Sequence, residues 1–399
     1  MKRLLLVASK AGYQTEAFAA AAARLELDVR LDLATNRCHH LEDPWRDGAL
    51  AVDFENPVLE RQAWDGITAV GDQATVVAAR LAADFGLPYH PFDAVQACCS
   101  KFDMRERFRL AGMLTPRYER VTERVCGLEF PCVLKPLGLS ASRGVIRANN
   151  QEEFDAAYGR IRRMLSQTPD LARDPRSAFI QIEEFIPGRE FAIEGIVTGG
   201  LLQVLAIFDK PDPLDGPFFE ETIYTTPSRE AEPVQEAIRG AVQRAVTALG
   251  LWHGPVHAEC RVNPRGVWML EVAGRPIGGL CARVLRFESG VGLEEVVIRH
   301  ALGLPVLEKL VAEGAAVMMI PIPRGGIYQG VNGLEEARAA GVESIEITAV
   351  PGQLLVPLPE GASYLGFIFA RGREAEQAVR EAHRKLRFEV LTALPLLKV

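Results

Sequence analysis

The sequence lacks the features that mark a membrane protein, a disulfide framework or a zinc site. No apolar run approaches the length that a transmembrane helix needs. The cysteines form no Cys-x-x-Cys pair, so they fit small buried residues in a reducing compartment. They are Cys38, Cys98, Cys99, Cys126, Cys132, Cys260 and Cys281. The first apolar run stops at Ser9, too early for a secretory signal, so we expect a cytoplasmic protein without a membrane partner.

An excess of positive charge and the common dinucleotide fingerprint are also missing. With 45 basic and 52 acidic residues, the net charge is −7, which argues against nucleic acid as a partner. The first expected turn from strand to helix, at residues 8–13, lacks the G-x-G-x-x-G spacing of a dinucleotide site. Adjacent His39 and His40 would point to opposite faces of a strand, so they make a poor metal chelate.

The chain does contain a regular alternation of strands and helices. The expected elements at the start cover residues 3–8, 15–25, 29–33, 67–71 and 73–85. This order is typical of a parallel α/β domain, which we assign to residues 1–95. Because 399 residues are too many for one core, further domains are expected. Residues 232–249 predict a packing helix, and a Gly- and Pro-rich α+β lobe is expected over residues 306–399.

Two alternating segments predict a hairpin near the middle of the chain. Residues 256–262 and 267–273 each alternate apolar and polar positions, as half-buried strands do. Between them, Pro264 suits a type I turn and Gly266 suits a following left-handed residue. The resulting three-residue loop pairs residue 263 with 267, 261 with 269 and 259 with 271.

In this register Glu259 and Glu271 face each other directly. Opposite side chains lie about 5 Å apart, so two carboxylates repel unless a divalent cation such as Mg²⁺ lies between them. One face of the hairpin would carry His257, Glu259, Arg261, Glu271 and, just beyond, Arg275. The other face would carry the core residues Val256, Ala258, Cys260, Val262, Trp268, Leu270 and Val272. The alternative interpretation is a solvated edge hairpin with scattered charges.

A strand that ends in Lys135 is followed by a loop of small and hydroxyl residues. Ser140, Ser142 and Gly144 lie in this loop, before the next short strand. Such a hairpin tip offers N–H and hydroxyl donors to phosphate oxygens, and it can close as a lid. Lys135 would add a point charge beside the phosphates. The alternative is a flexible surface hairpin, since the loop is not a Walker loop.

Residues 180–190 read as a strand that passes into a turn. Extended backbone there can present a carbonyl and an N–H group to an adenine edge, and Glu190 can accept from ribose hydroxyls. The alternative is that Glu183 and Glu184 are solvent-facing residues at a strand end. Further along, the polar, Pro-rich segment 208–221 is either a substrate loop, in which Glu220 or Glu221 meets an amine, or an ordinary surface loop.

These motifs occur in the order of the ATP-grasp superfamily, which the sequence resembles over roughly residues 95–305. The set is similar to D-alanine–D-alanine ligase, to biotin carboxylase and especially to L-amino-acid ligases. The resemblance implies an ATP-grasp fold over residues 96–305, with a lid lobe at about 112–186 and a larger lobe at about 187–305. It also implies ATP and Mg²⁺, for which Mn²⁺ can substitute, and suggests a homodimer.

The same resemblance assigns roles to residues. Lys101 and Lys135 would hold the phosphates, the Ser140–Gly144 segment would form the lid, and Glu190 would bind the ribose. Glu183 and the backbone of Glu184 and Ile186 would bind adenine. Glu259 and Glu271 would bind the metal. The weaker candidates for substrate contact are Lys210, Glu220, Glu221 and His257.

One position departs from the pattern of the superfamily. Many members have an Asn two residues after the second metal glutamate, where this chain has Ala273, so one oxygen ligand is missing. Arg275 keeps the spacing of the L-amino-acid ligases, in which an arginine faces the acyl phosphate. The expected activity is ATP-dependent joining of a small carboxylate to an amine. The alternatives are a bicarbonate enzyme similar to biotin carboxylase, and a regulatory module that binds ATP or ADP without turnover.

Overall fold

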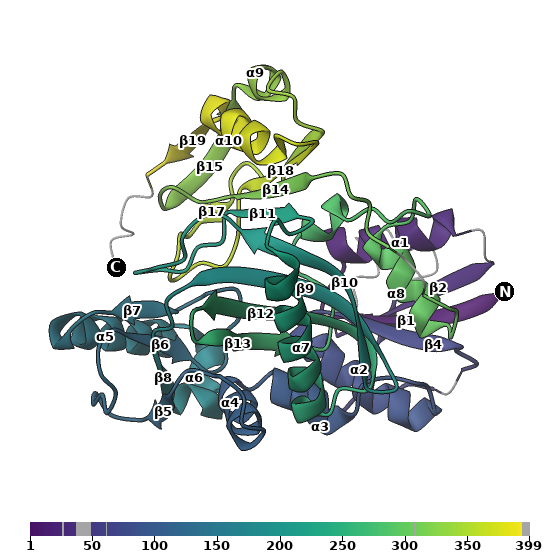
Figure 1. Cartoon of the computed structure of the whole chain (residues 1–399), viewed down its shortest axis with the longest axis horizontal. Helices are drawn as coiled ribbons and strands as arrows, with labels where there is room; N and C mark the ends of the chain where they lie inside the picture. Colours follow the sequence, from purple (N-terminus) through teal and green to yellow (C-terminus); the bar gives the residue numbers. More distant parts are fainter. Residues whose placement is uncertain (26–27, 37–48, 61, 307–308, 393–399) are drawn as a thin grey trace.

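The computed structural model describes residues 1–25, 28–36, 49–60, 62–306 and 309–392. It has the expected α/β class, with one large sheet and three smaller ones (Figure 1). Cys38, His39 and His40 lie outside the described residues. Within these residues, no helix is long and apolar enough to cross a bilayer.

The N-terminal sheet is parallel and has the strand order β3-β2-β1-β4. Its central strand is apolar and fully buried from Leu4 to Val7, as in parallel sheets that are covered on both faces. The carboxyl ends of its strands meet at one edge, where open α/β sheets bind ligands. The elements are β1 (Lys2–Ala8), α1 (Tyr13–Arg24), β2 (Val29–Thr35), β3 (Leu50–Ala51), β4 (Gly66–Val70), α2 (Asp72–Phe85) and α3 (Phe92–Cys98).

A second sheet, antiparallel and ordered β5-β8-β6-β7, forms the lid lobe. The apolar stripe of helix α5, which includes Phe154, Ile161 and Leu165, packs with Leu134 and Ile182 of this sheet. Strands β6 and β7 form the expected hairpin, and its tip, residues 137–144, is called the Gly/Ser loop below. The elements are β5 (Tyr118–Val121), β6 (Cys132–Pro136), β7 (Ile146–Ala148), α5 (Gln151–Gln167), α6 (Pro169–Arg173), a 3₁₀ turn (Pro175–Ala178) and β8 (Ile180–Glu184).

The central sheet has eight strands in the order β13-β12-β9-β10-β11-β14-β18-β16. Helix α7 has the bounds that its apolar spacing predicts, and Gly250 ends it with a φ of 76°. The strands are β9 (Arg189–Thr198), β10 (Leu201–Lys210), β11 (Ile223–Thr226), β12 (His253–Asn263), β13 (Gly266–Ala273), β14 (Ala315–Ile320), β16 (Ser344–Ile347) and β18 (Gly366–Arg371). The helices nearby are α4 (Lys101–Leu110), α7 (Glu232–Leu249), a 3₁₀ turn (Cys281–Val284) and α8 (Leu293–Ala301).

The last part of the chain adds a three-stranded sheet, β17-β15-β19, to the end of the molecule. Because β14, β16 and β18 continue the central sheet, the C-terminal lobe shares a sheet with the larger lobe. The domain limits at residues 95 and 305 stay a prediction. The remaining elements are β15 (Gly326–Asn332), α9 (Leu334–Arg338), β17 (Leu354–Leu355), α10 (Ala375–Lys385) and β19 (Arg387–Leu391).

Candidate active site

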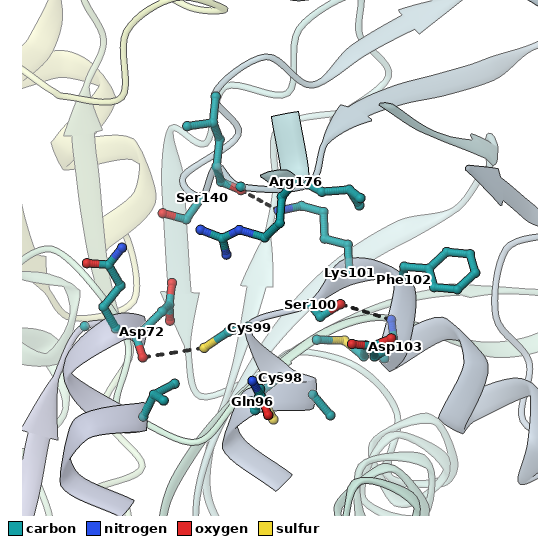
Figure 2. A pocket seen from close by; sticks show the side chains of 18 of the residues that line it. Asp72, Gln96, Cys98, Cys99, Ser100, Lys101, Phe102, Asp103, Ser140 and Arg176 are labelled. Atoms are coloured by element: carbon teal, nitrogen blue, oxygen red, sulfur yellow. Dashed lines mark hydrogen bonds between the residues drawn. The ribbon is translucent and has the colours of Figure 1, made fainter. Parts of the chain in front are cut away.

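A cleft of about 1590 Å³ lies between the N-terminal sheet and the Gly/Ser loop. Ser9, Asn36 and Gly71 line one end, at the carboxyl ends of parallel strands. At the other end, Lys101 reaches from the start of α4 and donates a hydrogen bond to the carbonyl oxygen of Leu139 (Figure 2). Single small-molecule pockets measure roughly 300–1,000 Å³, so this cleft is large enough for two ligands.

The hairpin brings Glu259 and Glu271 face to face, as expected, but through a different turn. Asn263 pairs with Gly266, so the turn has two residues, where three were expected. A β-bulge at Leu270 takes up the extra residue and restores the pairing of Glu259 with Glu271. The expected three-residue loop was therefore wrong, whereas the carboxylate pair is confirmed as a structural relationship.

The bulge also changes which side chains of β13 face the core. Cys260 pairs with Met269, and both are fully buried in the core beneath α7. Trp268 instead pairs with Arg261, and Leu270 lines the cleft. Because the bulge shifts the alternation by one residue, Trp268 and Leu270 do not lie on the expected face with Cys260, although Trp268 is buried as expected.

A row of alternating charges crosses the central sheet beside this pair. Glu190 on β9 lies between Lys210 on β10 and Arg261 on β12, and each is its direct register partner. Its Oε1 atom accepts from Lys210 Nζ at 2.8 Å, and its Oε2 atom accepts from Arg261 Nε at 2.8 Å. Because both oxygens of Glu190 already have cationic partners, ribose binding by this residue stays a prediction.

Lys210 is a buried lysine that contacts three buried or partly buried carboxylates. Its ammonium group donates to Glu190, to Glu221 and, at 3.0 Å, to Oε1 of Glu259. Burial opposes the charged form of this lysine, but the three carboxylates raise the pKa of Lys210 well above its ordinary value. Lys210 therefore acts as a fixed internal cation, and its amino group is not available to bind a substrate in this state.

Of the two glutamates proposed to meet an amine, only one is unpartnered in the described structure. Glu221 binds Lys210 and also accepts from the hydroxyl of Tyr224 at 2.7 Å. Glu220 is half-buried, and no hydrogen bond or ion pair joins it to another described residue. Burial raises the pKa of Glu220. The geometry therefore favours Glu220 over Glu221 for contact with a substrate amine.

His257 connects the metal candidate Glu259 to a second buried carboxylate. Its Nδ1 atom forms a short contact with Glu194, its register partner on β9, and its Nε2 atom lies 3.5 Å from Glu259 Oε1. Burial would lower the pKa of His257, but Glu194 and Glu259 raise it to about 9. The other oxygen of Glu194 accepts from the N–H of Ile277 at 3.1 Å. His257 therefore lies between two carboxylates that favour its charged form.

Glu183 holds the phosphate candidate Lys135 in position. The Nζ atom of Lys135 lies 2.6 Å from Glu183 Oε2, and Arg105 Nε lies 2.8 Å from Oε1. Burial alone would raise the pKa of Glu183, but Arg105 and Lys135 hold it at about 2. The Glu183 side chain is thus an anchor for two cations. A direct contact of this carboxylate with adenine remains a prediction.

The backbone of the expected adenine segment already has internal partners. The N–H of Glu184 donates to the carbonyl oxygen of Arg117 at 2.8 Å, and the carbonyl oxygen of Ile186 accepts from Arg261 Nη1 at 2.7 Å. The guanidinium of Arg261 also lies 5.1 Å from the ring of Phe185. Adenine recognition by the backbone of this segment stays a prediction, and Arg261 already occupies one acceptor position of the Ile186 carbonyl.

Arg275 is partly buried and paired with Asp72 at the start of α2. Its Nε atom donates to Asp72 Oδ1 at 2.5 Å, and its Nη1 atom donates to the adjacent carbonyl of Pro276 at 3.0 Å. Asp72 in turn lines the cleft (Figure 2). Burial would raise the pKa of Asp72, but Arg275 holds it below its ordinary value. The expected catalytic role of Arg275 stays a prediction, now with Asp72 as its partner.

The Gly/Ser loop presents some of its expected donors and uses others internally. Ser140 lines the cleft, whereas Ser142 is not among the lining residues. The N–H of Gly144 donates to the carbonyl oxygen of Pro359 in the C-terminal lobe at 2.8 Å. In this state, Ser140 is therefore the best placed of the three to meet a phosphate.

The carboxylates at the hairpin fit a divalent cation. Glu271 lines the cleft, and no hydrogen bond or ion pair joins it to another described residue, so both of its oxygens are available. Glu190, Glu221 and Glu259 also place oxygens within 4.8 Å of one another, but Lys210 already lies among them. Lys210 also contacts Oε1 of Glu259, so binding of Mg²⁺ or Mn²⁺ by Glu259 and Glu271, through the carboxylate oxygens that these ions prefer, stays a prediction.

Sequence patterns alone missed several residues of this site. Arg105 lies four residues after Lys101 on α4, which puts both on one helix face. Glu194 lies four residues after Glu190 on a strand, and so on the same sheet face. Asp72 lies two residues after the end of the parallel strand β4, at the edge where ligands bind. Each of these spacings was visible in the sequence.

Two segments of the chain match protein-family models. Residues 128–284 match the ATP-grasp domain, and residues 318–390 match the L-amino acid ligase C-terminal domain 2. The first match contains Lys135, Glu183, Glu259, Glu271 and Arg275.

Curated relatives cover parts of the chain. A D-alanine–D-alanine ligase of Lacticaseibacillus casei is 30% identical over 153 residues, which are 37% of this chain and 39% of that protein. A protein of Sinorhizobium fredii called y4rH, without a described function, is 25% identical over 317 residues, or 76% of this chain. The chain covers 63% of the length of that relative.

Solved structures extend the likeness over nearly the whole chain. The L-amino acid ligase of Bacillus licheniformis superposes with a TM-score of 0.77 at 24% identity, covering 98% of this chain and 99% of that one. The phosphoribosylglycinamide synthetase of Anaerococcus prevotii superposes with a TM-score of 0.70 at 17% identity, covering 98% and 100%. The chain therefore has the ATP-grasp fold and contains an ATP-grasp domain followed by an L-amino acid ligase C-terminal domain.

Proposed function

We propose that the chain is an ATP-dependent ligase that joins a small carboxylate to an amine through an acyl phosphate. The observation that carries the proposal is the composition of one cleft, which contains Lys101, Lys135 and the unpartnered carboxylate of Glu271. Cations beside a metal-binding carboxylate are what a triphosphate and its Mg²⁺ require. The same cleft continues to the strand ends of the N-terminal sheet, which leaves space for a second substrate.

The proposed reaction has two steps. A carboxylate oxygen of the first substrate attacks the γ-phosphorus of ATP, so that an acyl phosphate forms and ADP leaves. The amine nitrogen of the second substrate then attacks the acyl carbon, phosphate leaves, and the amine loses a proton. A metal ion held by Glu259 and Glu271 would supply charge neutralisation at the phosphates.

The chain's own residues would bind and orient the reactants. Lys101 and Lys135 would bind phosphate oxygens, with Lys135 held in place by Glu183. Ser140 would donate from the Gly/Ser loop, which excludes water when it lies over the nucleotide. Arg275 would stabilise the charge that develops on the acyl phosphate and the tetrahedral intermediate.

Amino acids are the proposed substrate class. The cleft offers cations at Lys101 and Lys135 for anionic groups. Glu220, which is half-buried and has no hydrogen bond or ion pair with the described residues, remains the candidate for an ammonium group. The names of two similar proteins, a D-alanine–D-alanine ligase and an L-amino acid ligase, support the same class.

The test is to measure ADP and phosphate release with Mg²⁺ and ATP across pooled amino acids, followed by pairs from any active pool. Release that requires both an acid and an amine is expected, with a new amide detected by mass spectrometry. The Glu271→Gln variant is the control for contaminating ATPases. ATP binding without release in any pool would support the regulatory module, and release that depends on bicarbonate alone would support the carboxylase alternative.

A further inference from the structure

The Gly/Ser loop is fastened to a part of the molecule outside its own lobe. The N–H of Gly144 donates to the carbonyl oxygen of Pro359 at 2.8 Å, and Arg143 Nε donates to the carbonyl oxygen of Glu360 at 2.7 Å. Both acceptors belong to residues 356–361, which follow β17 in the C-terminal lobe and are called the clamp loop here. This contact joins two segments that lie more than two hundred residues apart in the chain.

A bidentate ion pair strengthens this contact from the neighbouring helix. Arg160 on α5 donates through Nε to Glu360 Oε1 at 2.6 Å and through Nη2 to Oε2 at 2.9 Å. These hydrogen bonds to Arg160 lower the pKa of Glu360, so the carboxylate stays charged. An isolated exposed pair contributes little, but a bidentate pair has defined geometry. The lid lobe is thus bound to the clamp loop through a helix and a loop together.

The conformation that the clamp contacts hold is a strained one. Ala141 and Ser142 have φ values of 53° and 54°, in the left-handed region that residues with side chains rarely adopt. Within the loop, the N–H groups of Arg143 and Val145 donate to the carbonyl oxygens of Ser140 and Ser142, at 3.2 and 3.1 Å. Strained backbone of this kind persists only where surrounding contacts hold it, and such sites are often functional.

The other end of the loop is held from inside the cleft. Lys101 donates to the carbonyl oxygen of Leu139, two residues before Ala141, the first residue of the strained pair (Figure 2). Ser140 lies between this anchor and the clamp contacts, and it lines the cleft. The position of Ser140 is therefore determined from both sides, by α4 and by the C-terminal lobe.

We propose that Glu360 is a positioning residue for phosphate binding. Together with Arg160 it keeps the Gly/Ser loop in the strained conformation in which Ser140 faces the nucleotide cleft. The C-terminal lobe would thereby control how well the lid holds the phosphates. The inference rests on the proposed function insofar as the ligand is ATP, but the contact itself can be tested without a nucleotide.

The test combines hydrogen exchange with nucleotide affinity in the full-length protein. The variants are Glu360→Ala, Arg160→Ala, the double variant, and the charge swap of Arg160→Glu with Glu360→Arg. The matched control is Arg163→Ala on the same helix, because this exposed side chain makes no ion pair with the described residues. Urea unfolding of each variant establishes that the fold is intact.

In the absence of nucleotide, amides of residues 137–147 should exchange about tenfold faster in Glu360→Ala and Arg160→Ala than in the wild type, since a lost charged hydrogen bond corresponds to about this factor. The Kd for MgATP should rise about three- to tenfold while the Kd for adenosine stays unchanged, because only phosphate contacts depend on the loop. The double variant should lose no more exchange protection or MgATP affinity than either single variant. The charge swap should recover part of both.

The outcomes separate this inference from the proposed function. Unchanged exchange at residues 137–147 in both single variants would overturn the clamp. Additive losses in the double variant would also overturn it, because two residues that act through one contact cannot be independent. If the wild type fails to bind MgATP, the proposed function fails, while the exchange result still decides whether the clamp exists. A loss of adenosine affinity equal to that for MgATP would show a general structural role and overturn the positioning role.

Discussion

The ammonium nitrogen of Lys210 lies 3.0 Å from Oε1 of Glu259, so a built-in cation already contacts one of the two proposed metal ligands. The same nitrogen lies 2.8 Å from Oε1 of Glu190. Without this charge, the buried carboxylate of Glu190 and the partly buried carboxylates of Glu221 and Glu259 would repel one another at short range. Lys210 therefore allows the acidic cluster to fold before any metal binds.

Lys210→Met should destabilise the metal-free protein by about 3–5 kcal/mol, because removing one partner of a buried charge cluster leaves the others uncompensated. Added Mg²⁺ should restore more stability to this variant than to the wild type, since a divalent cation can replace the lost charge. Thermal unfolding with and without Mg²⁺ measures both effects. The control is Lys2→Met, where the lysine pairs with Asp65 at the surface. An equal response of both variants to Mg²⁺ would exclude a role of Lys210 as counterion.

Glu271→Gln should abolish ATP turnover and leave the fold intact. The amide is a weaker ligand for Mg²⁺, and the substitution also removes the repulsion from Glu259 across the hairpin. The free energy of unfolding should therefore stay equal or rise slightly. Phosphate release at saturating Mg²⁺ and ATP is the measurement, with urea unfolding as the check on folding. Turnover at the wild-type rate would remove this residue from the proposed metal site.

The low pKa of Glu183 predicts a pH dependence of stability. Its folded pKa is about 2, below the ordinary value of 4.5, so the unfolded chain binds the proton more readily. The stabilisation is present above about pH 4.5 and is lost as the pH falls towards 2. As the pH falls from 6 to 3, protonation of Glu183 should lower the free energy of unfolding by about 2 kcal/mol.

Urea unfolding at pH 6 and pH 3 tests this prediction. The loss of stability should be about 2 kcal/mol smaller in Glu183→Gln than in the wild type, because the variant has no proton to gain at this site. Glu184→Gln, at the next position and paired with the exposed Arg117, is the matched control and should follow the wild type. A Glu183→Gln variant with the full acid sensitivity of the wild type would contradict the prediction.

The strongest periodic patterns predicted much of this architecture. The helix over residues 232–249 has its expected bounds, because an uninterrupted apolar stripe and a terminal glycine define it locally. The first strand is also confirmed, since a short apolar run fits a strand buried on both faces. In contrast, the continuation of the central sheet through β14, β16 and β18 depends on pairing between distant segments, which no local pattern encodes.

The candidate site was predictable where a residue's role depends on its own strand. The pairing of Glu259 with Glu271 was found, although the turn was wrong, because two opposite errors of one residue cancelled at the bulge. The pairing of Lys210 with Glu190 and of His257 with Glu194 was not predictable, because each needs the strand order around β9. The Gly/Ser loop and the clamp loop lie even further apart in the sequence, so their contact depends on the complete fold.

The contact between Arg275 and Asp72 links the candidate catalytic arginine to the N-terminal domain. Arg275 should contribute little to ATP affinity, since other cations, among them Lys101 and Lys135, line the cleft. Its charge would matter when the acyl phosphate forms and the amine adds. Loss of one donor to such developing charge costs about 10²–10³ in rate. Arg275→Ala should therefore bind ATP within a few-fold of the wild type and form product about 10²–10³ times more slowly.

Asp72→Asn separates catalysis by Arg275 from simple packing. If Asp72 orients the guanidinium, this variant should keep ATP affinity and lose about tenfold in kcat, less than Arg275→Ala, because a neutral acceptor still holds the Nε donor. Arg275→Lys should restore little of the rate that Arg275→Ala loses. An ammonium group cannot keep the contacts to Asp72 and to the Pro276 carbonyl while also reaching a phosphate. Calorimetry for ATP and phosphate release with the true substrates measure the two quantities. Normal turnover by Arg275→Ala would remove the arginine from the mechanism and favour a regulatory nucleotide-binding module.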